Sequence, residues 1–278
     1  MKKLFKEQRL RQRGPQPLLN DSEILAMETV GEFLGISQDK RLYQFFRYHF
    51  GHFFPGLAKI HRTTFTRQAA NLWQVKQRIW QSVVGQLKFD SQLAIVDSLP
   101  IPVCQFARAN RCRGFKESAS FGKDMLVRQT FYGFRLHVRL NWPGIITRFL
   151  LAPANIHETR TLPELVKGSR GWVIGDRNFW SPALQAELNK SQIALEAPFR
   201  KATHDPWPQR SARLSRIRYR IDTVFSQLVD RYQIKRVWAR DMWHLSNRLL
   251  RKILSHTIAI FLNQFQGRPP LHLASLVN

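Results

Sequence analysis

The segment LAIVDSLP, residues 93–100, decides the fold predicted for this chain. It is a short apolar run that closes on an acid, Asp97, and such a run is typical of a buried strand. A second run of the same kind, GWVIGD at residues 171–176, ends on Asp176. Two strands of this type predict a sheet whose rim carries two carboxylates.

The residues between these two runs predict a hairpin. In residues 131–140 four apolar side chains alternate with Arg135, His137 and Arg139, which predicts a strand with one buried and one basic face. The turn sequence NWPG, residues 141–144, joins it to a second apolar run at 145–151. We expect residues 104–130, which are polar, basic and contain glycine, to form a long loop.

The later segments alternate between helical and strand patterns. We expect helices near 161–167, 182–190, 212–232 and 243–263, a strand at 193–197 and a loop at 200–210. The whole order predicts an α/β fold, a mixed sheet flanked by helices.

The N-terminal part predicts an all-α region, with helices near 20–35, 38–52 and 64–87. Such a region is either a DNA-binding module of helix-turn-helix type or a brace for the domain that follows, and no residue decides between them. We divide the chain into a basic, disordered tail at 1–16, a helical region at 17–90, an α/β domain at 91–266 and a tail at 267–278.

The charge of the chain points to a polyanionic partner. Lys and Arg number 44 against 19 Asp and Glu, for a formal net charge of +25. Nucleic acid is favoured over an anionic membrane surface because the excess spreads through segments with folded patterns and is rich in arginine. Two cysteines, Cys104 and Cys112, indicate neither a disulfide framework nor a zinc site. We expect a cytoplasmic protein, since no secretory signal or membrane span is evident.

Three acids are candidates for a metal site: Asp97, Asp176 and Asp222. The first two leave buried strands, where a sheet builds its sites, and Asp222 lies beside the apolar face of a predicted helix. Each has a plainer interpretation, since Asp often starts a turn and a helical Asp often pairs with a nearby arginine such as Arg218 or Arg220. Glu196, at the end of the next strand, is a second choice for the third acid.

Carboxylates of this kind suit Mg²⁺ or Mn²⁺, which take oxygen ligands. Two such ions can activate the attacking oxygen and stabilise the leaving oxygen of a phosphodiester. The sequence has no phosphate-binding loop of Walker type, so ATP hydrolysis is not indicated.

Several strings around these acids resemble bacterial insertion-sequence transposases with a DDE triad, and the insertion-sequence-982-type subfamily is the most similar. The strings keep a shared order over residues 17–265: LNDSEILAME (19–28), IVDSLPIPVC (95–104), FYGFRLHV (131–138), PANIH (153–157), GDRNFW (175–180), RIDTVFSQL (220–228) and RKILSHTIAIFLN (251–263).

The resemblance implies an RNase-H-like fold and a metal-dependent enzyme that cleaves and joins DNA at terminal inverted repeats and target DNA. It implies two Mg²⁺ or Mn²⁺ ions on Asp97, Asp176 and Asp222, and a homodimer on DNA in the bacterial nucleoid. The family normally has Glu at the third position. Asp is one methylene shorter, so a catalytically impaired DNA-binding relic stays an alternative, as does an RNase-H-like nuclease without strand transfer.

The basic residues near the three acids are expected to grip DNA phosphates. The candidates are Arg108, Arg111, Arg113, Lys116, Lys123, Arg135, Arg177, Arg213, Arg216, Arg218 and Arg220. Trp180 and Trp207 are either stacking platforms for an unpaired base or packing residues, and His157 either orients a phosphate or makes a structural hydrogen bond. Tyr219 and Tyr232 lack the Arg and His set that a tyrosine recombinase needs.

Overall fold

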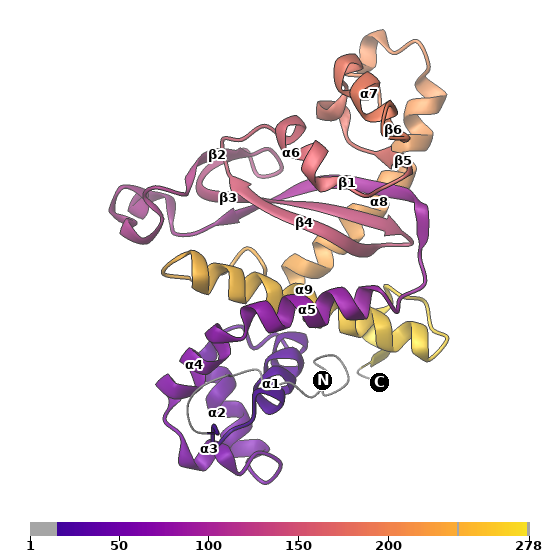
Figure 1. Cartoon of the computed structure of the whole chain (residues 1–278). Coiled ribbons are helices and arrows are strands. Elements are labelled where there is room, and N and C mark those ends of the chain that lie inside the picture. Colours follow the sequence, from indigo (N-terminus) through magenta and orange to yellow (C-terminus); the bar gives the residue numbers. More distant parts are fainter. Residues whose placement is uncertain (1–15, 238, 277–278) are drawn as a thin grey trace. The chain divides into compact units, whose positions relative to one another are not determined.

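The computed structural model describes residues 16–237 and 239–276, and these fold into two compact units (Figure 1). Unit 1 comprises the described residues up to Gln86 together with Leu228–Leu262, and unit 2 comprises Leu87–Gln227 and the described residues from Asn263 onward. The sequence analysis assigned residues 228–262 to the α/β domain, whereas here they cluster with the N-terminal helices. The expected domain boundaries stay a prediction.

Unit 2 is built on a mixed sheet whose central strand is β1 (Asp90–Pro102). On one side β1 pairs antiparallel with β3 (Gln129–Trp142), which in turn pairs with β4 (Ile145–Pro153) and, at its start, with β2 (Ser120–Asp124). On the other side follow the parallel strands β5 (Gly171–Ile174) and β6 (Ile193–Glu196). The predicted RNase-H-like mixed sheet flanked by helices is confirmed.

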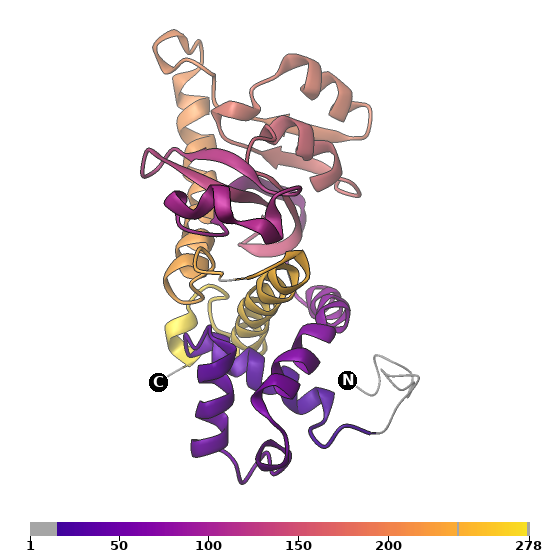
Figure 2. The same cartoon turned by 90° about the vertical axis from the view of Figure 1, so that its left-hand side faces the viewer.

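Helices cover both faces of this sheet, because its central strands are apolar on both sides. Ala94, Val96 and Val173 pack in one buried cluster with α6 (Glu158–Leu165) and α7 (Pro182–Asn189). Side chains of α8 (Pro208–Asp230) contact β1 and β6 on the opposite face, and Figure 2 shows α8 along that side. The face that carries Asp97 is therefore the face of α8, since Asp97 alternates with Val96.

The structure corrects three details of the predicted sheet. Strand β1 does not end at Asp97 but continues to Pro102, because its antiparallel pairing with β3 extends that far. Residues 104–130, expected to be a loop, contain two short 3₁₀ helices, η2 (Phe106–Arg111) and η3 (Arg113–Phe115), as well as strand β2.

The expected basic face of β3 is largely covered rather than exposed. His137 is 1% exposed, and Arg139 donates to the backbone oxygen of Leu165 (3.3 Å) and to Oγ of Ser169 (2.6 Å). Helix α6 and the loop after it supply these acceptors, so Arg139 fixes α6 on the sheet.

The C-terminal segment, expected to be a tail, is also held to unit 2. The Gln227 side chain donates to the backbone oxygen of Leu271 (2.6 Å), and Asn263 donates to those of Pro270 and His272. The last described element, η6 (Leu273–Leu276), buries Leu273.

Unit 1 is all-helical, as predicted for the N-terminal region. Its elements are α1 (Asp21–Phe33), α2 (Asp39–His49), α3 (Gly56–Lys59), α4 (Arg62–Asn71), α5 (Trp73–Val84) and most of α9 (Met242–Phe265). The single helix expected near 64–87 is wrong. The helix is interrupted at Leu72, which follows α4 and precedes α5. The side chain of Leu72 is buried in the core of unit 1.

Unit 1 also contains a buried network of charges that joins α9 to the N-terminal helices. Arg251, 1% exposed, donates to Asp39 (2.6 Å) and to Glu32, and lies 3.5 Å from Glu28. Lys252 pairs with Glu32 at 2.6 Å, and the fully buried Lys76 pairs with Glu28 at 2.5 Å. Because a buried charge without a partner is costly, this network ties the position of α9 to α1 and α2.

Among the described residues, no helix is both long and apolar enough to cross a membrane.

Candidate active site

Two of the predicted acids follow the paired residues of adjacent parallel strands. Ile95 of β1 pairs with Ile174 of β5, and this is the last pair before the two strands diverge. Asp97 and Asp176 each lie two residues beyond that pair, Asp97 still within β1 and Asp176 just after the end of β5. Asp176 is close enough to act on Asp97, since its negative charge raises the pKa of Asp97.

Asp97 is held on both carboxylate oxygens. Its Oδ1 accepts from the backbone N–H of Ser98 (2.7 Å), and its Oδ2 accepts from Nη1 of Arg218 on α8 (2.9 Å). Burial raises the pKa of Asp97 to about 7; Arg218 opposes this, whereas the negative charges of Asp176 and Glu158 add to it. Acidic groups therefore crowd around Asp97, and a cation in this place would be stabilised by them.

Asp176 caps the short 3₁₀ helix η4 (Arg177–Phe179). Its Oδ1 accepts from the backbone N–H of Asn178 (2.8 Å) and its Oδ2 from the side-chain amide of Asn178 (2.9 Å). The preceding Gly175 has no room for a side chain, because an added Cβ would lie 2.6 Å from Cδ2 of the buried Phe179. The sequence GD is thus needed for the turn that presents Asp176.

A third carboxylate near this pair, Glu158, was missed by the sequence analysis. It is the first residue of α6 and accepts a hydrogen bond from Oγ of Ser98, with Arg135 at 3.8 Å. Burial raises the pKa of Glu158, and Asp176 contributes to the rise. The sequence feature that could have identified Glu158 is its position directly after the PANIH string.

His157 has a structural role in the turn before α6. Its Nδ1 accepts from the backbone N–H of Thr159 (3.3 Å), which caps the helix. The structural interpretation of this histidine accounts for its contacts.

Asp222 lies on α8, four residues after Arg218, and is partly exposed. In the part of the chain that the structure describes, no three or more His, Cys, Asp or Glu side chains are grouped so that they could hold a metal ion. The triad of Asp97, Asp176 and Asp222 is therefore not assembled here, and the role of Asp222 stays a prediction.

The other candidates of the sequence analysis have different surroundings. Glu196 forms an ion pair with Arg210, which also donates to the backbone oxygen of Ala197 (3.2 Å). Tyr219 is 69% exposed on α8, whereas Tyr232 is fully buried in unit 1 and cannot act as a nucleophile on DNA.

The residues present fit a hard divalent cation in part. Asp97 and Asp176 offer oxygen donors from adjacent strands, and the repulsion between them is what a cation would relieve. In this structure their oxygens are engaged by Arg218 and by Asn178, so these two contacts would have to open for a cation to bind.

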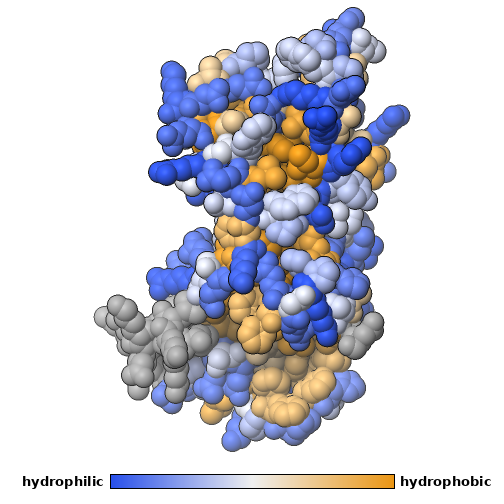
Figure 3. All heavy atoms as spheres, turned by 90° about the vertical axis from the view of Figure 1, so that its right-hand side faces the viewer, coloured by the Kyte–Doolittle hydropathy of each residue, from blue (hydrophilic) through white to orange (hydrophobic). Residues whose placement is uncertain are grey.

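The predicted DNA-contacting residues of unit 2 fall into two groups. Arg135, Arg218 and Arg220 are partly buried and engaged: Arg135 donates to Ser98 and Lys123, Arg218 to Asp97, and Arg220 stacks on the Trp142 ring at 4.8 Å. The others have exposed side chains: Arg108, Arg111, Arg113, Lys116, Lys123, Arg177, Arg213 and Arg216. Figure 3 shows hydrophilic side chains over much of one face of the molecule, with hydrophobic patches between them.

The mixed sheet flanked by helices is that of an RNase-H-like domain. Comparison with known families agrees: the model of the family described as "Transposase DDE domain" matches residues 88–242, more than half of the chain. The chain belongs to this family of DDE transposases. No curated protein and no solved structure matches it.

Proposed function

We propose that this protein cleaves DNA strands at the ends of an insertion sequence and joins them to target DNA, as a member of the insertion-sequence-982-type subfamily. The observation that supports the proposal is that Asp97 and Asp176 follow the last paired residues of the adjacent parallel strands β1 and β5, with Asp176 near enough to raise the pKa of Asp97. The family match supports the same chemistry.

In this proposal Asp222 supplies the third carboxylate. Arg218 reaches Asp97, and residues four apart on a helix lie on the same side, so Asp222 is one turn from the contact. Two Mg²⁺ or Mn²⁺ ions held by the three acids would activate the attacking oxygen and stabilise the leaving oxygen of the phosphodiester.

The arginines of the site have a separate role. A DNA phosphate competes with Asp97 for the guanidinium of Arg218, and the exposed arginines and lysines of η2, η3 and α8 bind neighbouring phosphates. The partner is double-stranded DNA, the terminal repeats and the target, bound by a homodimer in the bacterial cytoplasm at the nucleoid.

Two alternatives follow from particular observations. A DNA-binding relic is favoured by the aspartate at position 222, which reaches less far than glutamate, and by the engagement of Asp97 with Arg218. A nuclease without strand transfer would share the same acids and differ only in its products.

The test is cleavage of a labelled duplex that carries the DNA flanking the coding sequence, with Mg²⁺, Mn²⁺ or EDTA. We expect metal-dependent nicking that falls at least about 100-fold in Asp97→Ala and in Asp176→Ala, because misplaced catalytic groups cost rates of that order. Asp230→Ala, at an exposed position on the same helix α8, is the matched control and keeps wild-type activity.

The third acid is tested by two further variants. We expect Asp222→Ala to abolish nicking and Asp222→Glu to increase it, because the longer side chain reaches closer to the pair. Binding without nicking by the wild type and by Asp222→Glu, in both metals, would establish the relic. Nicked product without any joined product would establish the nuclease.

A further inference from the structure

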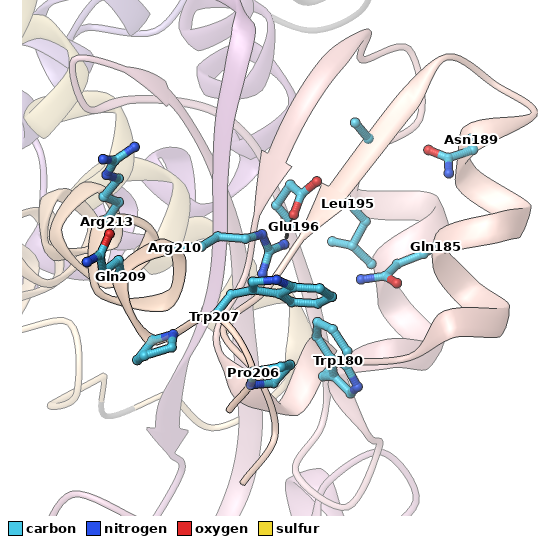
Figure 4. A pocket seen from close by; sticks show the side chains of 12 residues that line it. Trp180, Gln185, Asn189, Leu195, Glu196, Pro206, Trp207, Gln209, Arg210 and Arg213 are labelled. Atoms are coloured by element: carbon cyan, nitrogen blue, oxygen red, sulfur yellow. Dashed lines mark hydrogen bonds and ion pairs between the residues drawn. The ribbon is translucent and has the colours of Figure 1, made fainter. Parts of the chain in front are cut away.

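Unit 2 has an open pocket of about 730 Å³ whose lining includes Trp180, four residues after Asp176 in the chain (Figure 4). Its walls come from the residue after η4, from α7, from β6 and from the start of α8, and the side chains used below are Trp180, Gln185, Trp207, Gln209, Arg210 and Arg213. Its volume is in the range of sites that hold one small organic group.

One wall is connected directly to the candidate catalytic residues. Asp176 is the residue directly before η4, and Trp180 is the residue directly after it. The Trp180 ring packs edge-to-face on Phe199, with 4.9 Å between ring centroids, so its position is fixed from behind. The backbone turn that presents Asp176 therefore also positions this wall of the pocket.

The pocket also presents an exposed aromatic ring, that of Trp207, next to Trp180 in Figure 4. Trp207 is 60% exposed, although an indole of this size is usually buried. It stands between Pro206 and Pro208, and its backbone N–H donates to Oδ1 of Asp205 at 2.8 Å. The backbone that carries the ring is thus restrained, and little conformational entropy would be lost when a planar ligand stacks on it.

The polar side chains of the pocket suit a base and its phosphate. Arg210 is engaged by Glu196 and by the backbone of Ala197, whereas exposed Arg213 makes no ion pair or hydrogen bond with any residue of the described ranges. Gln185 and Gln209 add amide donors and acceptors, and Figure 4 shows both tryptophans and these polar groups around the same opening.

We propose that this pocket binds one unpaired nucleotide of a DNA strand, with the base stacked on Trp207 and Trp180 beside it, and with the phosphate near Arg213. The inference rests on the proposed function only in taking DNA as the ligand, and it adds a subsite for a base that is out of the duplex. Stacking on an aromatic platform tolerates every base, so the pocket selects for unpaired structure and not for sequence.

The experiment measures binding in EDTA, so that it is independent of cleavage. A fluorescein-labelled duplex with three unpaired nucleotides at one end is compared with the same duplex in which those three nucleotides are abasic, and with a blunt duplex. The abasic form keeps the phosphates and removes the bases, so the affinity ratio isolates base stacking.

We expect the wild type to bind the unpaired bases at least about fivefold more tightly than the abasic form, since stacking on aromatic side chains contributes on this scale. In Trp207→Ala this affinity ratio falls to about one, and the affinity for the blunt duplex stays within about twofold of the wild-type value. Trp207→Phe retains part of the ratio. Trp172→Ala is the matched control, because Trp172 is 56% exposed in the same unit but does not line the pocket, and it keeps the wild-type ratio.

A wild-type ratio near one, or an unchanged ratio in Trp207→Ala, overturns the proposal. A change of oligomeric state in Trp207→Ala without DNA, measured by light scattering, also overturns it, because the ring then serves contact between copies. A wild-type affinity ratio near one in a protein that still cleaves DNA overturns the pocket proposal and leaves the proposed enzyme function standing. A ratio that is present in a protein without nicking activity leaves the pocket standing and removes the proposed enzyme function.

Discussion

Replacement of Arg251 should destabilise unit 1 more than any other single loss of charge in its network. This arginine is 1% exposed on α9 and binds Glu32 and Asp39 by side-chain hydrogen bonds and Ser37 by its backbone oxygen (2.5 Å). Arg251→Ala leaves these acceptors buried with less positive charge around them. A buried ion pair that loses one partner costs about 3–5 kcal/mol of folding free energy.

The structure allows part of this cost to be worked out. Burial would raise the pKa of Asp39, yet attraction to Arg251 and Arg248 lowers it from 3.8 to about 2. That net change, after the opposing effect of burial, corresponds to about 2.5 kcal/mol of stabilisation of the carboxylate. Glu32 keeps its contact with Lys252, so the cost in Arg251→Ala should be near 3 kcal/mol and not the sum of all broken contacts.

The assay is urea unfolding at pH 7, combined with amide hydrogen exchange of peptides from α1 and α9, because the two units need not unfold together. Arg251→Met separates charge from volume and should be about as destabilising as Arg251→Ala. Arg248→Ala is the control: Arg248 also contacts Asp39 (3.2 Å) but is 19% exposed, so we expect a loss of about 1 kcal/mol. A loss below about 1 kcal/mol in both Arg251 variants would refute the view that this network holds α9 in unit 1.

Three further outcomes are expected. Burial lowers the pKa of His256 to about 4, so the native state loses stability as the pH falls from about 6.5 toward 4. Urea unfolding should therefore give a lower free energy of unfolding at pH 5 than at pH 7.5, and His256→Gln should reduce this difference by roughly 2 kcal/mol. An equal difference in both proteins would contradict this. Gly175→Ala should reduce DNA nicking about 10- to 100-fold, because the new methyl group meets buried Phe179 and displaces the carboxylate that follows, and unchanged nicking rates would show that the turn adapts. Arg113→Ala and Lys116→Ala, both at exposed positions, should each lower the slope of log Kd against log salt by about one, and a slope equal to that of the wild type would remove that residue from the phosphate contacts.

The elements that could be predicted from the sequence are those whose burial leaves a local pattern. Strands β1 and β5 were found because their apolar runs are short and end near an acid, and β3 because its side chains alternate. Strand β2 was missed because its sequence SFGKD has no such pattern, and it is a strand only through pairing with the first residues of β3. Pairing with a distant segment leaves no local sign in a five-residue stretch.

The buried charges of unit 1 show the same limit. Glu28 and Glu32 lie in an amphipathic helical stretch and Lys76 in another, and such residues are ordinarily solvated. Here each is at most 1% exposed, because its partner comes from a helix far along the chain. A local pattern cannot reveal a partner more than 200 residues away, as in the pair of Glu32 with Lys252.

In the candidate site, too, some residues have a local sequence pattern and others depend on contacts with distant segments. This difference matters most for the third acid. Asp97 and Asp176 were singled out because each follows a short apolar run, and the parallel pairing of these two runs ends two residues before each acid. The pairing of β1 with β5 does not reveal which part of α8 lies near Asp97. The ion pair of Arg218 with Asp97 shows that it is the part around Arg218. Arg218 reaches β1 from one helical turn before Asp222, so Asp222 lies on the same side of α8 as this contact. We therefore predict that release of Arg218 from Asp97 is a step toward metal binding at this site. Metal binding and phosphate binding should then favour each other, because a phosphate that draws Arg218 away from Asp97 frees the carboxylate oxygen that a cation needs. Arg218→Gln should therefore weaken the dependence of Mn²⁺ affinity on DNA, measured by isothermal titration with and without duplex, and an undiminished coupling in this variant would show that Arg218 is a structural counter-ion only.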